Sequence, residues 1–99
     1  MNILWSEKAE EDFEATILYL MENWNLEVVQ DFTSEVQRIL NIISLNPKTF
    51  QYNQLVKCHV VPLTKHVSLF YEIKKKNIVL LRYWNNFQNP RKFSLKTKK

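Results

Sequence analysis

The sequence predicts a single α+β domain in which a short strand is followed by two long helices and then by three more strands. Residues 7–46 carry apolar side chains at the three- and four-residue spacing of amphipathic helices. Residues 56–84 instead carry runs rich in β-branched and aromatic side chains, separated by turn residues. A chain of 99 residues with 45% hydrophobic content fits one domain with one modest core.

The first strand and the first helix follow directly from the N-terminal pattern. Asn2–Trp5 alternate as a short strand does, and Ser6 is suited to cap a helix whose opening turns carry Glu7 and Glu10. We expect this helix over residues 7–24, with its acids facing solvent. Its apolar positions fall on one stripe: Ala9, Phe13, Ile17, Leu20, Met21 and Trp24.

A second helix is predicted between Asn25, which can cap it, and Asn46, because the residue before Pro47 is pushed out of the α region. Two helices of about 18 to 20 residues joined by so short a turn form an antiparallel αα-hairpin. We expect both apolar stripes to face one sheet. The stripe of the second helix consists of Val29, Phe32, Val36, Ile39, Leu40 and Ile43.

The remaining strands are predicted over residues 56–61, 67–74 and 78–84, with turns at 62–64 and 74–77. The chain has no glycine, so we expect Asn77 to take the positive φ of the last turn. The last strand is apolar on both faces, which is typical of a central strand. Strict alternation would place Ile78, Leu80, Arg82 and Trp84 on one face, as an exposed apolar patch containing a cation. A bound partner would cover this patch, unless residues 50–52 or the C-terminal tail fold over it.

Charge is divided between the two halves of the chain. Residues 1–46 carry nine carboxylates and two cations, whereas residues 47–99 carry twelve cations and only Glu72, giving net charges of −7 and +11. One folded unit therefore presents an acidic and a basic side to different partners. The absence of glycine excludes P-loop and dinucleotide-binding motifs.

The remaining composition indicates a cytoplasmic protein without a membrane span. Cys58 is the only cysteine, so no intramolecular disulfide can form and a reducing compartment is expected. No apolar run approaches the roughly 18 residues of a membrane span, and Glu7 comes too early for a secretory signal. Cys58, His59 and His66 do not suffice for a metal site, and no cofactor is predicted.

In the order and spacing of its segments, nearly the whole chain resembles the toxins of the RelE/ParE superfamily from bacterial type II toxin–antitoxin pairs. The segments that carry the resemblance are residues 19–24, Ser44-Leu45-Asn46-Pro47, Leu69-Phe70-Tyr71-Glu72-Ile73, and residues 81–90 with Trp84 and Gln88-Asn89-Pro90. The resemblance implies a RelE/ParE-like fold over residues 1–93. Residues 94–99 are basic and lie at the chain end, so we expect them to form a mobile tail. The resemblance also implies a growth inhibitor that a cognate antitoxin neutralises.

Within that superfamily the chain is more similar to the ParE-like branch, whose members inhibit DNA gyrase, than to the RelE-like branch. Two long helices favour ParE. Ser68 stands where RelE-like nucleases carry an arginine, and serine cannot supply that charge. Phe87 replaces the arginine that many relatives have between the tryptophan and the Gln-Asn-Pro segment.

Two alternatives remain open at this stage. A RelE-like, metal-independent endonuclease that cleaves mRNA on the ribosome would use Lys57, His59, Arg82 and Arg91. A non-catalytic relic would bind only nucleic acid or protein, although the sequence favours an ordinary solvated turn for Lys74-Lys75-Lys76. The predicted surface for target or antitoxin consists of Lys57, Lys65, Arg82, Trp84, Phe87, Arg91 and Lys92.

Overall fold

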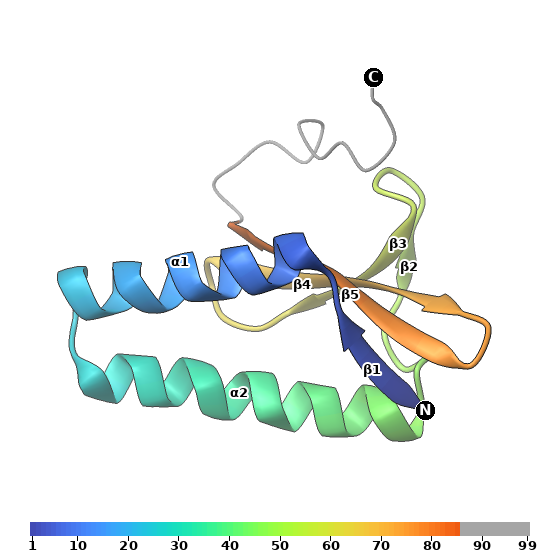
Figure 1. Cartoon of the computed structure of the whole chain (residues 1–99), viewed down its shortest axis with the longest axis horizontal. Helices are drawn as coiled ribbons and strands as arrows, with labels where there is room; N and C mark the ends of the chain where they lie inside the picture. Colours follow the sequence, from blue (N-terminus) through green and yellow to red (C-terminus); the bar gives the residue numbers. More distant parts are fainter. Residues whose placement is uncertain (86–99) are drawn as a thin grey trace.

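The computed structural model describes residues 1–85 as two helices packed on one face of a five-stranded sheet (Figure 1). Strand β1 (Asn2–Trp5) leads into helices α1 (Glu7–Asn23) and α2 (Leu26–Leu45), which are followed by β2 (Tyr52–Asn53), β3 (Cys58–Pro62), β4 (Val67–Lys74) and β5 (Asn77–Asn85). The predicted α+β class and element order are confirmed. The predicted tail at 94–99, and the end of the domain at residue 93, lie outside the described residues.

Both helices begin at the caps that the sequence indicated. Ser6 Oγ accepts a hydrogen bond from Ala9 N at 3.0 Å, and Asn25 Oδ1 accepts one from Val28 N at 3.0 Å. Each bond satisfies a backbone donor that the first turn of a helix leaves unpaired. Only Trp24 and Asn25 separate the helices, so α1 and α2 form the predicted antiparallel hairpin (Figure 1).

The sheet has the strand order β1-β5-β4-β3-β2, so the first and last described strands are neighbours. β1 pairs with β5 in parallel, with Asn2 opposite Asn77 and Trp5 opposite Leu80, and the other pairs are antiparallel. The central position of β5 was predicted from its apolar faces and is confirmed. β2 has only two residues and was not predicted.

A β-bulge in β5 reverses the faces expected for its second half. The register shifts between Phe70 and Tyr71, which oppose Arg82 and Leu80, so Leu81 is the extra residue. Beyond the bulge, Tyr83 points to the helices and Trp84 to the opposite face. The prediction that Ile78, Leu80, Arg82 and Trp84 share one face was therefore wrong.

The main core lies between the helices and the sheet. α2 contributes the buried residues Phe32, Val36, Ile39 and Ile43, and α1 contributes Ala9 with the partly buried Phe13, Ile17 and Leu20. The sheet supplies Val61, Leu69, Tyr71, Ile78, Leu80 and Tyr83. The predicted stripes therefore face the sheet, except at the hairpin turn, where Met21 and Trp24 are 49% and 64% exposed.

A second cluster fills the face of the sheet that points away from the helices. It contains Val56, Cys58, Phe70, Leu81 and Trp84, and all five are buried. The rings of Phe70 and Trp84 stack with centroids 5.8 Å apart. The expectation of an exposed apolar patch was wrong, because Trp84 is only 4% exposed and Ile78 and Leu80 face the helices.

Lysine adopts the left-handed conformation in two turns, whereas the sequence predicted a positive φ only for Asn77. β3 begins at Cys58, two residues later than expected, and Lys57 precedes it with φ 58°. In the turn between β4 and β5 the positive φ of 56° belongs to Lys75, whereas Asn77 already lies in β5. Lys57 and His59 therefore do not alternate along one strand as predicted.

Within residues 1–85 no helix has the length and apolar character needed to cross a membrane. The same residues contain no group of three or more histidine, cysteine or acidic side chains placed to hold a metal ion.

Candidate partner-binding groove

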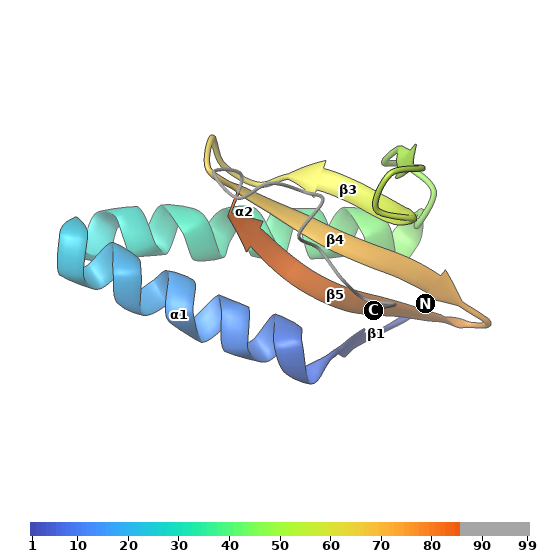
Figure 2. The ribbon, with the colours of Figure 1, turned by 90° about the horizontal axis from the view of Figure 1, so that it is seen from above.

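A groove of about 980 Å³ opens where the helical hairpin projects beyond the sheet. Figures 1 and 2 both show the turn between α1 and α2 extending past the ends of the strands. Four elements form the walls: α1, α2, the turn between β3 and β4, and the end of β5. Their lining residues include Asp12, Ala15, Thr16, Tyr19, Leu20, Trp24, Val28, Asp31, Phe32, Glu35, Leu63, Lys65, His66, Arg82 and Tyr83.

The helices line this groove with residues from one side of each cylinder. Asp12, Ala15, Thr16 and Tyr19 of α1 are three or four positions apart, as are Val28, Asp31, Phe32 and Glu35 of α2. The small side chains of Ala15 and Thr16 leave room for another segment to approach the α1 backbone. The stripe that lines the groove therefore borders the core stripe of each helix, and Phe32 belongs to both.

Apolar side chains at the rim of the groove remain in contact with water. Trp24 is 64% exposed and Tyr19 is 58% exposed, although both are large aromatic residues. The neighbouring residues Leu18, Met21 and Leu26 are also about half or more exposed, so we call these five residues the hairpin end. Exposed apolar surface of this kind, rimmed by polar residues, marks interaction sites in soluble proteins.

An ion pair connects α1 to β5 at the inner end of the groove. Arg82 Nε donates to Asp12 Oδ2 at 2.6 Å, and Arg82 Nη2 donates to Asp12 Oδ1 at 3.1 Å. Tyr83 N also donates to Asp12 Oδ2, at 3.1 Å. The side chains of Arg82 and Asp12 are 25% and 17% exposed, and the guanidinium lies 5.1 Å from the centre of the Trp84 ring. Arg82 thus has an intramolecular role.

Asp12 also completes the hydrogen bonding along the free edge of β5. β1 pairs with β5 only as far as Trp5 and Leu80. Beyond that point Ser6 N donates to Leu80 O at 3.0 Å, and Ser6 Oγ donates to Leu81 O at 3.0 Å. The contact of Asp12 with Tyr83 N continues this series, so the start of α1 takes over the strand edge that β1 leaves unpaired.

One wall of the groove carries carboxylates, and the opposite wall carries the Lys65 ammonium group. Asp31 and Glu35 lie on α2, while Lys65 and His66 lie on the turn between β3 and β4. Arg38 donates to Glu35 at 3.0 and 2.6 Å, and this hydrogen bonding lowers the pKa of the Glu35 carboxyl. The groove therefore fits a segment that has an apolar face flanked by charges of both signs.

Tyr83, one of the residues that line the groove, carries its phenol oxygen buried beneath the surface. The residue is 4% exposed, and its phenol oxygen has no hydrogen-bond partner within residues 1–85. Burial raises the pKa of this phenol, so it stays protonated at neutral pH.

Comparison with known families decides what kind of protein carries this groove. The sequence model of a family described as "ParE toxin of type II toxin-antitoxin system, parDE" matches residues 3–86, from β1 through both helices to the end of β5. The chain belongs to this toxin family. The predicted preference for the ParE-like over the RelE-like branch is confirmed.

Solved structures support the same fold assignment. The chain is similar to a protein in a structure entitled "Chromosomal ParDE TA system from P. aeruginosa", with a TM-score of 0.66 and 21% sequence identity. The match covers 86% of this chain and 95% of the other. No curated protein matches the sequence. The structural match establishes the ParE-like fold, and the family match establishes membership.

Of the residues predicted to bind target or antitoxin, three lie together at the groove. Arg82, Trp84 and Lys65 all line it, with Lys65 exposed on the turn between β3 and β4. Lys57 lies at the other end of β3. Phe87, Arg91 and Lys92 lie outside the described residues. The binding role of the set stays a prediction.

The residues predicted for a ribonuclease are not brought together within residues 1–85. His59 pairs with Tyr71 on the side of the helices, whereas Arg82 pairs with Phe70 and turns to Asp12 at the sheet edge. Lys57 lies in a turn outside β3, and Arg91 lies outside the described residues. No constellation of a nucleophile-activating base and phosphate-binding cations is formed by the described members of the set.

His59 instead has contacts that hold the chain after α2 against the sheet. Its Nδ1 lies 2.8 Å from Phe50 O, and its ring stacks on Tyr71 with centroids 5.0 Å apart and an interplanar angle of 13°. The Tyr71 hydroxyl donates to Pro47 O at 2.7 Å, and burial raises the pKa of Tyr71 to about 12. A carbonyl partner requires the proton on Nδ1, so this nitrogen is not available as a base.

Sequence analysis missed most of the residues that form the groove. Asp12, Tyr19 and Asp31 were counted as part of a solvated acidic surface or not singled out. One signal was present: Asp12, Ala15, Thr16 and Tyr19 repeat at helical spacing beside the core stripe of α1. That second stripe contains small and aromatic residues, which a purely solvated face does not require.

Proposed function

We propose that this ParE-family toxin inhibits DNA gyrase and is neutralised by a cognate antitoxin, one segment of which occupies the groove. Family membership over residues 3–86 is the observation that carries the proposal. The similar structure from P. aeruginosa comes from a ParDE toxin–antitoxin system, which favours the same kind of partner here.

The chemistry of the groove supports an amphipathic segment as the occupant. Its exposed aromatic rim would be removed from water, which supplies the main driving force for association. Acidic Asp31 on one wall and the ammonium group of Lys65 on the other would fix the orientation of a segment that carries both signs of charge. A helix lying along α1 and α2 meets both requirements.

The described residues favour inhibition by binding over RNA cleavage. His59 packs against Tyr71 on the helix side of the sheet, whereas Arg82 is paired with Asp12 at the edge of β5, so the two are not brought together. Ser68, which stands where RelE-like nucleases carry an arginine, is only 6% exposed. We therefore propose a toxin that acts on gyrase without a catalytic group of its own.

A supercoiling assay tests the target. Purified gyrase and relaxed plasmid are incubated with the toxin, alone or mixed with the antitoxin encoded beside it. We expect the toxin to block supercoiling or to trap cleaved DNA, and the antitoxin to restore activity. Unaffected gyrase would refute this target, and mRNA cut in the ribosomal A site would replace it with the RelE-like function.

A pair of adjacent variants tests the seat of the antitoxin. Tyr19 lines the groove and is 58% exposed, whereas Leu18 is 63% exposed and does not line it. Because interface aromatics typically contribute 1 kcal/mol or more, Tyr19→Ala should weaken antitoxin binding roughly tenfold, and Leu18→Ala should leave it within about twofold. Calorimetry measures both affinities. Equal affinities for the two variants would remove the groove from the interface.

A further inference from the structure

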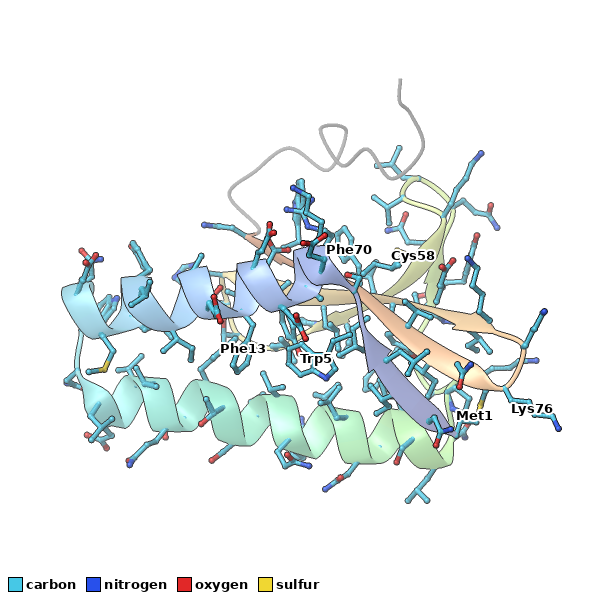
Figure 3. The ribbon with its side chains drawn as sticks, viewed as in Figure 1. Met1, Trp5, Phe13, Cys58, Phe70 and Lys76 are labelled. Atoms are coloured by element: carbon cyan, nitrogen blue, oxygen red, sulfur yellow. The ribbon has the colours of Figure 1, made fainter. Side chains whose placement is uncertain are left out.

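Five exposed lysines gather at the end of the molecule opposite the hairpin turn. β3 and β4 are antiparallel, so Lys57 before β3 and Lys75 after β4 lie at the same end of the sheet. The Met1 ammonium group donates to Ser44 O at 3.0 Å, which places the end of α2 and the following Lys48 there as well. We call this set the lysine end: Lys48, Lys57, Lys74, Lys75 and Lys76. Figure 3 shows Lys76 at the tip of the hairpin of β4 and β5, pointing away from the domain.

Carboxylates are nearly absent from this end. Among residues 1–85 the other acids lie on α1 or on the first half of α2, so Glu72 is the one acid that accompanies the lysine end. Glu72 Oε2 is 3.8 Å from Lys74 Nζ, with the lysine side chain 72% exposed. This single long ion pair does not neutralise the five lysines, so the electrostatic potential over the two turns is positive.

Two residues within 1–85 have a left-handed backbone conformation, and both belong to the lysine end. Lys57 has φ 58° and Lys75 has φ 56°. Lys57 ends a turn in which its own N–H donates to Asn53 O at 2.7 Å, a position where glycine or asparagine is usual. Lys75 is the first of two residues linking β4 to β5, where a positive φ again favours glycine or asparagine.

Asparagine would fit the positive φ at these two positions with less backbone strain than lysine. The sequence contains ten asparagines, a residue that tolerates the left-handed region, yet lysine occupies both sites. Backbone strain that folding does not require is found where a side chain serves function. Strain at two lysines on one surface therefore indicates that their charge matters more than the lost stability.

We propose that the lysine end is a binding surface for the phosphodiester backbone of nucleic acid, separate from the groove. Lysine ammonium groups on flexible stems suit phosphate oxygens, whereas lysine is depleted at protein interfaces. The lysines lie on turns and at the end of β4, at the same end as exposed Leu45 and Leu55, and ammonium groups contact phosphates whatever the base sequence. The surface would therefore bind DNA without sequence preference, by neutralising phosphates and releasing counterions.

A double variant separates charge from folding at this surface. Lys57→Asn with Lys75→Asn removes two charges while placing a residue that prefers the left-handed region at both turns. We expect its melting temperature to rise by about 5 °C. The matched control, Lys8→Gln with Arg38→Gln, removes the same charge from exposed sites elsewhere on the molecule.

Fluorescence anisotropy with a labelled 20-base-pair duplex measures binding over a range of salt concentrations. For the asparagine variant we expect the slope of log Kobs against log salt to fall in magnitude by about 1.8, since each lost phosphate contact contributes about 0.9. The control variant should change the slope by less than about 0.5. Equal slopes for the two variants, or no binding by the wild type, would overturn the proposal.

A competitor distinguishes nucleic acid from an acidic protein as the ligand. Polyglutamate at equal charge concentration should displace the duplex poorly if phosphate is the preferred anion. Displacement as effective as that by unlabelled duplex would overturn the assignment to nucleic acid. Because the assay contains no gyrase or antitoxin, its outcome is independent of the supercoiling result.

Discussion

The two ends of this domain differ in what they expose and in how each feature lowers stability. The hairpin end exposes five large apolar side chains beside acidic ones, because the helices project beyond the sheet. The lysine end exposes cations on turns that hold lysine in the left-handed region. The folded core requires neither feature. Both candidate binding surfaces therefore lie where the chain keeps an unfavourable feature exposed, and neither lies where side chains pack well.

The largest expected effect separates a buried tryptophan from an exposed one. Trp84 is 4% exposed and stacks on Phe70, so Trp84→Ala should lower the free energy of unfolding by about 3 to 5 kcal/mol. Trp24 is 64% exposed at the groove, and Trp24→Ala should cost less than about 1 kcal/mol. Urea unfolding measures both. Similar losses for the two variants would show that the hairpin end is packed and not a free surface.

A second prediction concerns the ion pair between the helices and the sheet. Asp12→Ala removes the bidentate partner of Arg82 and the acceptor for Tyr83 N, so we expect a loss of about 2 kcal/mol. The estimate stays below that for a fully buried pair because both side chains keep some contact with water. Glu11→Ala, at an exposed position one residue earlier, should change stability by less than about 0.5 kcal/mol. Equal effects would mean that Asp12 does not anchor α1.

The buried tyrosines predict a loss of stability in alkali. Burial raises the pKa of Tyr71 to about 12, above the value near 10 of an unfolded chain, so the folded state holds the phenolic proton more tightly. The corresponding stability is fully present below about pH 10 and is lost as the pH rises toward 12, up to roughly 2 kcal/mol. Thermal unfolding at pH 8 and pH 11 measures this loss. Tyr71→Phe should reduce the difference between the two pH values, and an unchanged difference would exclude Tyr71 as its source.

The smallest expected change in stability comes from the residue that caps α2 at the turn between the two helices. Asn25→Ala removes the side chain that caps α2 through Val28 N and should cost about 1 kcal/mol. Asn25→Asp keeps a capping oxygen and should cost much less. Denaturant midpoints compare the two variants with wild type. Equal denaturant midpoints for Asn25→Ala and Asn25→Asp would show that the side-chain cap at residue 25 does not stabilise the domain.

Local signals made the elements of this fold predictable. Ser6 and Asn25 cap the helices as expected, β4 has the predicted bounds, and the helices carry the predicted core stripes. The resemblance to ParE toxins, based on the order of short segments, led to the correct family. These features depend on spacing along the chain, which a single sequence displays directly.

Features that depend on neighbours distant in the sequence were not predictable. The bulge at Leu81 follows from how β5 aligns with β4, and it moved Trp84 to the face opposite Leu80. The groove exists because α1 and α2 project past the sheet, which no periodicity in the helices reveals. Lysine at positive φ could not be foreseen either, since asparagine stood two residues away at Asn77.

We propose that the groove at the hairpin end is the surface through which an antitoxin neutralises this toxin. The most direct measurement is the antitoxin concentration needed to restore gyrase supercoiling in the presence of wild-type toxin, Tyr19→Ala or Leu18→Ala. We predict that all three inhibit gyrase and that only Tyr19→Ala requires about tenfold more antitoxin, matching its weaker binding. Reversal of Tyr19→Ala at the wild-type concentration, or loss of its inhibition of gyrase, would contradict the account.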